Sequence, residues 1–356
     1  MGGDCSRILI MQKTKKKIVN ILFIMAVIII LAGGFYLAEK SILPHERINV
    51  EDPVTVRVQS GSSLTEIAKL LDEKGVIRNV NDFILTVKIF RAANRLKAGQ
   101  YEFQPGLSNY KVMKKLMEGS ISDEKIVIPE GYTSKQIASL LQKRLEIDST
   151  EFVSLIKDQN LLQETGVESN SLEGYLYPDT YHLNWGISAR SVIKRLVKEF
   201  HRNFTDSLKS AARQKGWDVH QIVTLASIIE GEAILDEERR TISSVYHNRL
   251  VKGMLLQADP TIQFIIPDGP RRLLNRDLRL DSPYNTYMYA GLPPGPVNNP
   301  GIKSMIAAID PADTPYLYFV ARGDGGHTFS RTLNQHLRAK RDFDRHRREV
   351  YGKKRK

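Results

Sequence analysis

Two glutamates near the end of a predicted helix, Glu230 and Glu232, are the side chains whose type and spacing first suggest chemistry. The helix is expected between Asp218 and Ala233, because Asp218 and Gln221 have capping-box spacing and apolar residues follow at helical intervals. At 100° per residue, the two carboxylates lie about 80° to either side of the apolar stripe. Each therefore sits at the border between core and solvent.

A carboxyl group at such a border can act as a general acid near neutral pH. Desolvation disfavours its charged form and raises its pKa, which proton donation at neutral pH requires. The alternative is a pair of solvated glutamates at a helix end, and the spacing alone leaves both open. Gly231 separates the two glutamates. Since glycine costs about 1 kcal/mol in a helix interior, we expect the helix to be locally loose there.

The motifs that are missing from the sequence narrow the reaction class. There is one cysteine, Cys5, and no HExxH, GxGxxG, GxxxxGK[ST] or GxSxG motif, so we expect no metal, no cofactor and no nucleotide chemistry. Carboxylates with amide and hydroxyl helpers suit glycoside cleavage. Because Glu230 and Glu232 are about 160° apart around one helix, both cannot face one glycosidic bond. This favours a reaction with a single catalytic carboxyl, and helical geometry does not choose between the two.

Polar side chains that could position a sugar follow later in the chain: Gln257, Asp259, Tyr284, Asn285, Tyr287 and His327. The elements expected around them are an amphipathic helix at 237–252, a short helix at 302–309 and a strand at 316–320. A basic stretch, 264–282, contains four arginines. Glycine, proline and asparagine force irregular backbone at 291–301. A long irregular segment inside a compact domain is typical of a functional site.

The N-terminal part of the chain predicts a membrane anchor. A basic segment, 1–17, precedes twenty residues without a formal charge, 18–37, which at ~1.5 Å per residue span a ~30 Å hydrocarbon layer. Lysines before the apolar run place the N-terminus in the cytoplasm and the bulk of the chain outside it. The alternative is a cleaved signal peptide, but its apolar core usually runs ~7–15 residues.

Residues 48–145 contain a weak internal repeat. Each of its three copies predicts a strand end, a glycine turn, a Ser or Thr cap and an amphipathic helix. Gly61, Gly106 and Gly131 occupy the equivalent turn position in the three copies. Residues 146–217 are expected to be mostly helical around a tyrosine-rich turn at 172–181. That turn suits either a sugar platform or a structural corner.

Several ordered motifs resemble the MltG (YceG-like) family of endolytic murein transglycosylases: Glu173–Tyr181, Leu225–Ala233, Leu256–Thr261, Tyr284–Tyr287, Gly291–Gly295, Asn299–Gly301, Tyr316–Val320 and Gly326–Phe329. The resemblance implies an α+β fold, with a transmembrane helix, a LysM-like module at 48–145 and a mixed α+β catalytic domain at 146–337. It also implies cleavage between N-acetylmuramic acid and N-acetylglucosamine in nascent strands at the cytoplasmic (inner) membrane. The 1,6-anhydro ends left behind would terminate elongation by peptidoglycan synthases. The module could bind glycan or serve only for packing and spacing.

The resemblance also assigns roles to residues. Glu232 would be the catalytic acid and base, while Gln257, Asp259, Tyr284, Asn285 and Tyr287 would position the sugars. Glu230 would contact substrate or form an ion pair with Arg239, Arg240 or Arg249, with neither alternative preferred. His327 would contact substrate or be a core histidine bonded to backbone.

The net charge of +12 suits an anionic partner. The basic residues are scattered or terminal, without interleaved aromatics, so we expect no nucleic acid. The basic tail, 338–356, is expected to meet solvent or an anionic polymer. The competing functional hypothesis is a glycan-binding scaffold of the cell envelope without activity.

Overall fold

The computed structural model describes residues 3–43, 53–59, 61–119, 123–267 and 269–352. The chain folds as two compact units. Unit 1 comprises Met1–Asp123 and Asn184–Gly186, and unit 2 comprises Glu124–Leu183 and Ile187–Lys356. Helices predominate, and the strands that the structure describes form three two-stranded sheets. The chain is therefore mixed α+β with one N-terminal apolar helix, as predicted.

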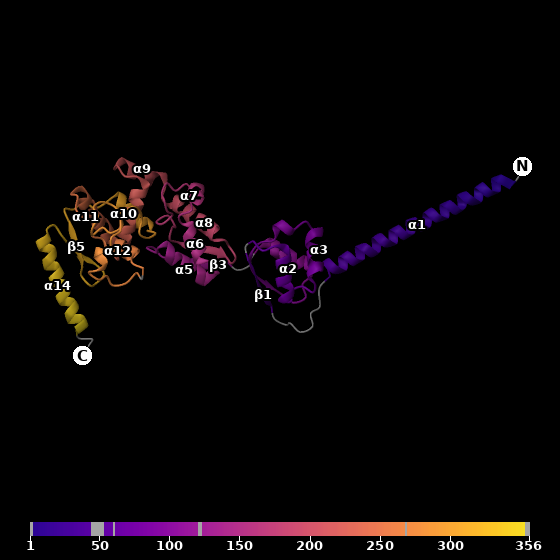
Figure 1. The fold of residues 1–356 in the computed structure, drawn as a ribbon, viewed down its shortest axis with the longest axis horizontal. Coiled ribbons are helices and arrows are strands. Elements are labelled where there is room, and N and C mark those ends of the chain that lie inside the picture. Colours follow the sequence, from indigo (N-terminus) through magenta and orange to yellow (C-terminus); the bar gives the residue numbers. More distant parts are fainter. Residues whose placement is uncertain (1–2, 44–52, 60, 120–122, 268, 353–356) are drawn as a thin grey trace. The chain divides into compact units, whose positions relative to one another are not determined.

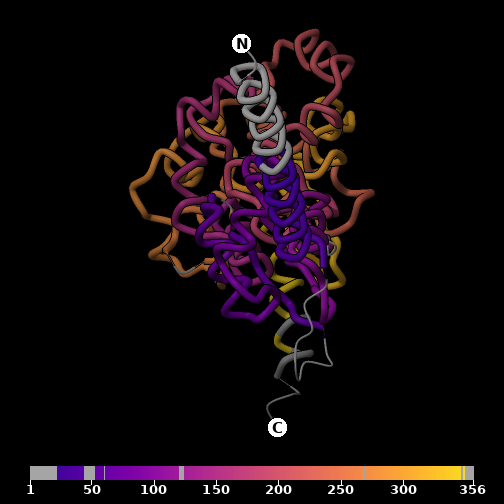
Figure 2. The backbone as a smooth tube through the Cα atoms, turned by 90° about the vertical axis from the view of Figure 1, so that its right-hand side faces the viewer, coloured from indigo at the N-terminus to yellow at the C-terminus, as the bar shows by residue number. Residues whose placement is uncertain are grey.

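The apolar helix is α1, Gly3–Ser41, which runs unbroken in Figure 1 and whose coloured part is seen nearly end-on in Figure 2. Its part Leu22–Ser41 has a mean hydropathy of 2.3 and is long and apolar enough to cross a membrane, a property that a signal sequence shares. The last turn of α1 is fixed to unit 1, where Lys40 pairs with Asp82 at 3.1 Å and its carbonyl accepts the Asn109 amide at 2.8 Å.

Unit 1 contains the first two repeat copies. Strands β1, Val54–Val58, and β2, Gly99–Phe103, pair antiparallel, and three helices pack with them: α2, Leu64–Glu73; α3, Val80–Ile89; and α4, Asn109–Glu118. A short 3-10 turn, η1, occupies Ala93–Arg95. Ser63 and Ser108 cap α2 and α4, and Gly61 and Gly106 have φ values of +86° and +75°. The strand, glycine turn and capped helix therefore occur as expected.

The third repeat copy belongs to unit 2. It consists of β3, Asp123–Val127, and α5, Ser134–Leu145, with Thr133 as N-cap and Gly131 at φ +77°. Ile137 and Leu141 of α5 are buried in the core of unit 2. The boundary between the units therefore lies near residue 123, whereas the expected module ended at residue 145. Residues 48–52, with which that module would begin, lie outside the described residues.

Unit 2 is built mainly from helices around α10, Val219–Glu232. Its other helices are α6, Ser149–Leu155; α7, Gln159–Thr165; α8, Ala189–Asn203; α9, Asp206–Gln214; α11, Arg239–Val251; α12, Asp259–Ile265; α13, Ile302–Ile309; and α14, Leu333–Gly352. Its 3-10 turns are η2, Asp236–Glu238, and η3, Asp277–Arg279. Strand β4, Thr180–Asn184, pairs with β3, and β5, Tyr318–Ala321, pairs with β6, His327–Ser330. Residues 222–229 of α10 are all buried, with α11, α12 and α13 packed beside this helix (Figure 1).

The tyrosine-rich turn at 172–181 is a structural corner. Tyr175, Tyr177 and Tyr181 are buried in the core of unit 2. The hydroxyl of Tyr181 donates to the carbonyl of Tyr177 at 2.6 Å. Because all three rings are buried, they present no face to a sugar.

Candidate active site

Glu232 ends α10, and its carboxyl group is desolvated although part of the residue reaches solvent. Burial raises its pKa to about 7, and the charge of Asp259 acts in the same direction. The hydroxyl of Tyr246, which donates to Oε1 of Glu232 at 3.2 Å, lowers the pKa, as do the Asp259 backbone N–H and the charge of Arg249. Such a group is part protonated and part ionised near neutral pH.

Tyr246 and Arg249 come from one face of α11, three residues apart. Both are buried, with 1% and 7% of their surface exposed. Arg249 donates to the carbonyls of Leu256 at 2.6 Å and Leu317 at 2.7 Å, and its guanidinium lies over the Tyr318 ring at 5.3 Å. It therefore fixes the segment leading to Asp259. From the sequence, Arg249 was expected only as a possible ion-pair partner of Glu230 and no role was predicted for Tyr246, although their i,i+3 spacing on a predicted helix was a usable signal.

Asp259 and Gln257 stay exposed at this site. Asp259 accepts a hydrogen bond from the Tyr287 hydroxyl at 2.5 Å. Gln257 has a φ of +49°, unusual for a residue other than glycine, and its N–H donates to the carbonyl of Thr286 at 3.0 Å. The N–H of Ala258 donates to the Thr286 hydroxyl, also at 3.0 Å. This tight turn brings Asp259 to the carboxyl group of Glu232.

Gly231 has a packing role that the sequence did not reveal. A Cβ at this position would lie 2.5 Å from Cγ of Pro260. Glycine therefore lets the first turn of α12 approach the last turn of α10, which is helical through Gly231. The close approach keeps Asp259, which precedes Pro260, beside Glu232.

Glu230 points to the other side of α10 and forms a buried ion pair. Its Oε1 accepts from Nη1 of Arg239 at 3.0 Å, and its Oε2 accepts from the N–H of Gly301 at 3.0 Å. The two side chains are only 6% and 8% exposed. Because both oxygens are committed, the geometry favours the ion-pair alternative, with Arg239 as the partner, over substrate contact.

Asn285 makes its side-chain hydrogen bonds within the protein, and Tyr284 packs against a neighbouring ring. Asn285 is fully buried, and its amide donates to the carbonyls of Leu278 at 3.1 Å and Leu280 at 2.7 Å. Its Oδ1 accepts the N–H of Tyr287 at 2.9 Å. The half-buried Tyr284 packs its ring on Phe264, with centroids 5.1 Å apart. Asn285 is therefore not placed to contact a sugar, as was expected, because its side-chain polar atoms bond to backbone groups.

His327 is a buried core residue with a carboxylate partner. It is 8% exposed, its Nδ1 lies 2.7 Å from Oε2 of Glu238, and its N–H donates to Oε1 at 2.9 Å. The ring of Phe319 meets it edge-on at 5.2 Å. The geometry therefore favours a core histidine over a substrate contact. Its ring bonds to the Glu238 carboxylate, where a backbone partner was expected.

The segment 291–301 runs along α10 and does not form an exposed rim. The carbonyl of Pro294 meets Nε2 of His220 at 2.9 Å near the start of α10, and the N–H of Val297 donates to the Ser227 hydroxyl at 3.0 Å midway. Gly301 reaches Glu230 at the end of the helix. The irregular backbone is explained by these hydrogen bonds and by burial from residue 295 to 301.

A second buried carboxyl, Glu173, fixes this segment to α5. It accepts from the N–H of Ser134 at 2.9 Å, from its hydroxyl at 2.5 Å, and from the amide of Asn299 at 3.0 Å. Burial raises its pKa to about 7, partly offset by these donors. Glu173 is 6% exposed and fully enclosed by protein partners, so its role is structural.

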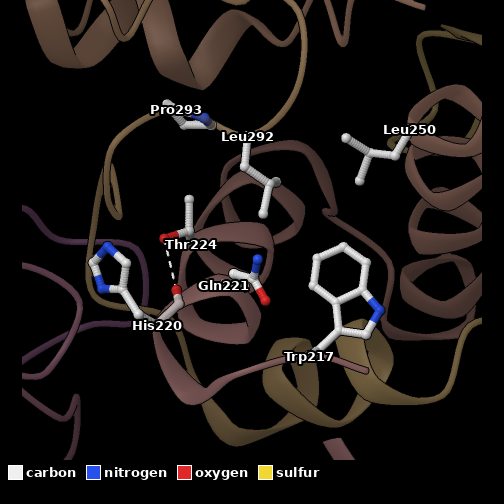
Figure 3. A pocket seen from close by; sticks show the side chains of 7 residues that line it. All are labelled: Trp217, His220, Gln221, Thr224, Leu250, Leu292 and Pro293. Atoms are coloured by element: carbon white, nitrogen blue, oxygen red, sulfur yellow. Dashed lines mark hydrogen bonds between the residues drawn. The ribbon is translucent and has the colours of Figure 1, made fainter. Parts of the chain in front are cut away.

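A cavity of about 420 Å³ lies at the opposite end of α10 (Figure 3). It is lined by Trp217, His220, Gln221, Thr224, Leu250, Leu292 and Pro293. Gln221 precedes Glu232 by eleven residues, or roughly 16 Å at 1.5 Å per residue. The lining has no carboxylate, so this cavity is not the reaction centre. Within the described residues, no group of three or more His, Cys, Asp or Glu could hold a metal ion.

The model of the YceG-like family matches residues 56–342. The chain is 33% identical to the endolytic murein transglycosylase of Bacillus subtilis (strain 168), over 88% of this chain and 91% of that protein. It is 28% identical to the endolytic murein transglycosylase of Streptococcus pneumoniae serotype 2, over 84% of this chain and 60% of that longer protein. A crystal structure of a yceG-like protein from Listeria monocytogenes is similar, with a TM-score of 0.57 and 35% identity. The match covers 81% of this chain and 99% of that one.

Proposed function

Because the chain belongs to the YceG-like family, we propose that it is an endolytic peptidoglycan lytic transglycosylase. It cleaves the bond between N-acetylmuramic acid and N-acetylglucosamine within nascent strands, leaves 1,6-anhydro ends and terminates elongation. The names of its relatives support this activity. The observation that carries the proposal for this chain is the Glu232 carboxyl, whose pKa of about 7 suits both proton donation and proton acceptance.

The reaction needs one carboxyl group. Glu232, protonated, gives its proton to the glycosidic oxygen as the bond to the anomeric carbon of muramic acid breaks. The 6-hydroxyl of the same muramic residue attacks that carbon, and its proton passes to the Glu232 carboxylate. The bound strand supplies the nucleophile, so proximity contributes much of the rate and no water is consumed.

The neighbours of Glu232 divide into two roles. Tyr246 and Arg249 are buried and stabilise the carboxylate form when the acid has given up its proton. Asp259 and Gln257 are exposed beside it and contact the sugars, with Tyr287 holding Asp259 in place. Glu230, Asn285 and His327 have no substrate contact in this proposal, because their polar groups already bond within the protein.

The setting of the enzyme is part of the proposal. The apolar part of α1 anchors the chain in the cytoplasmic (inner) membrane, with the N-terminus in the cytoplasm and both units outside. The LysM-like repeats hold the growing strand, and peptidoglycan synthases supply it. A non-catalytic, glycan-binding scaffold of the cell envelope would have no use for a desolvated carboxyl beside an exposed aspartate.

The test is a digest of purified, uncrosslinked glycan strands by the full chain in detergent, wild type beside Glu232→Gln. Mass spectrometry distinguishes anhydro ends from products that are heavier by one water. Anhydro-ended internal fragments from the wild type alone support the proposal. Heavier products would mean a hydrolase, and equal products from both chains would exclude Glu232 as the acid.

A further inference from the structure

An arginine-rich loop, residues 271–281, follows α12 and is folded by one buried carboxylate. Asp277 is 4% exposed and binds the Arg271 guanidinium through both oxygens, at 2.7 and 3.0 Å. Its Oδ2 also accepts the N–H of Leu274 at 2.7 Å. Arg271 holds the pKa of Asp277 at about 2, so the carboxylate stays charged at physiological pH. The loop therefore has a defined shape.

The arginine loop is fastened to the residues that hold the reaction centre. The side chain of Gln263, in α12, makes two hydrogen bonds to the backbone of Arg271, at 2.6 and 3.0 Å. Asn285 donates to the carbonyls of two loop residues, Leu278 and Leu280, and accepts the N–H of Tyr287. Since the Tyr287 hydroxyl binds Asp259, one short series of hydrogen bonds joins the loop to the catalytic neighbourhood.

Three arginines of this loop, Arg272, Arg276 and Arg279, are exposed. Among the residues that the structure describes, none of these guanidinium groups has a carboxylate within salt-bridge distance. Arg276 is the N-cap of the 3-10 turn η3 and Arg279 is its last residue, and side chains three residues apart lie on the same side of such a turn. Two unpaired guanidinium groups thus project together from a fixed turn.

Exposed apolar side chains accompany these cations. Leu280 is 38% exposed, Met288 47% and Tyr289 45%. The Tyr289 hydroxyl donates to Asp281 at the end of the loop, which keeps that ring beside it. A surface with two neighbouring guanidinium groups and apolar side chains fits a peptide that carries carboxylates. Arginine binds a carboxylate through two parallel hydrogen bonds.

We infer that the arginine loop binds the carboxylates of the peptide stems on the glycan strand. The inference rests on the proposed function, which brings a stem-bearing strand to Glu232. The sugars of such a strand are uncharged, whereas its stems carry free carboxylates. Contacts to the stems would make the enzyme select strands whose peptides are intact.

The experiment measures binding and cleavage separately. The full chain carrying Glu232→Gln is titrated, by fluorescence anisotropy, with labelled strands whose stem carboxylates are free and with the same strands after conversion of those carboxylates to amides. We expect the strand with free stem carboxylates to bind about tenfold more tightly, as one to two charged hydrogen bonds allow. Adding Arg276→Gln and Arg279→Gln should abolish this preference. The control pair Arg202→Gln and Arg213→Gln, exposed on α8 and α9, removes the same charge and should retain it.

Equal affinity for the two strands, or a preference that survives the loss of Arg276 and Arg279, would overturn the inference. The double variant should also be titrated with strands that carry a lipid pyrophosphate but no stems. If its affinity falls only for these strands, the loop binds the pyrophosphate, and the inference is overturned as well. In the parallel digest, the Arg276→Gln and Arg279→Gln chain with Glu232 intact should keep its kcat and show a raised KM on stem-bearing strands. If the wild type yields no anhydro ends while the binding preference persists, the proposed function fails and the loop assignment stands.

Discussion

The hydroxyl of Tyr246 lies 3.2 Å from Oε1 of Glu232, and this hydrogen bond joins α11 to the last turn of α10. Burial raises the pKa of Glu232, whereas the hydroxyl donor favours the ionised form and lowers it. The Asp259 carboxylate acts against the tyrosine and favours the protonated form. The protonation state of Glu232 therefore depends on two neighbours that can be changed one at a time.

Replacing Tyr246 with phenylalanine should raise the pKa of Glu232, because the donor that stabilises its carboxylate is lost while the buried ring remains. We expect the falling limb of the pH–kcat profile to move to higher pH, because Glu232 then keeps to higher pH the proton that it donates. The kcat on the plateau should fall about tenfold, equivalent to ~1.4 kcal/mol, because the carboxylate left after proton donation loses its donor. The rate of anhydro-end release from pH 5 to 9 measures it. An unmoved profile with unchanged kcat would show that the hydroxyl has no influence on Glu232.

Replacing Asp259 with asparagine should move the profile in the opposite direction. The asparagine removes a negative charge that raises the pKa of Glu232, and the backbone N–H of residue 259 still donates to the carboxyl. The matched control is Asp310→Asn, an exposed aspartate that pairs with Arg240. A shift to higher pH, or an equal shift in the control, would contradict this electrostatic account.

The sequence predicted α10 and its capping box, and the structure places Asp259 beside Glu232. Local periodicity and capping chemistry suffice for such features, because they depend on residues close in the chain. The role of Tyr246 was indicated only by its spacing from Arg249, because its partner Glu232 lies on another helix. The role of Asn285 depends on the fold of the loop whose carbonyls it binds, which periodicity and capping do not predict. Likewise, the third repeat copy looked like the first two, but Ile137 and Leu141 pack in unit 2.

Gly231→Ala should destabilise the fold although alanine is the better helix former. The new Cβ would lie 2.5 Å from Cγ of Pro260, and such overpacking costs about 1–3 kcal/mol against a gain of about 1 kcal/mol in helix propensity. Urea denaturation followed by circular dichroism measures the difference. Gly231→Ala combined with Pro260→Ala should restore stability, and a fully stable single variant would contradict the close packing.

Arg239→Met should be strongly destabilising because it leaves Glu230 buried without a counter-charge. The Glu230 side chain is only 6% exposed, and breaking a buried pair typically costs about 3–5 kcal/mol. The control is Arg240→Met, next in the chain and 57% exposed in its pair with Asp310, which should cost less than about 1 kcal/mol. Equal melting temperatures for the two variants would mean that the Glu230–Arg239 pair contributes no more than a surface contact.

Glu173 should make the stability of the protein depend on pH. Its pKa is about 7 in the folded chain against an ordinary value of 4.5, so the folded state binds more protons between these pH values. Its contribution is complete below pH 4.5 and is lost as pH rises through 7, by up to about 3 kcal/mol at 1.36 kcal/mol per pKa unit. The urea midpoint of the wild type should therefore fall between pH 5 and pH 8.

Glu173→Gln isolates this contribution, because glutamine keeps the size of the side chain and does not titrate. Its amide meets the Asn299 amide, so the variant should be less stable than the wild type at pH 5. The gap should narrow by pH 8, since only the wild type loses the stability that protonation of Glu173 supplies. Glu232 titrates in both chains with the same sign and cancels in the comparison. Parallel midpoints from pH 5 to pH 8 would mean that the Ser134 and Asn299 donors keep Glu173 ionised throughout.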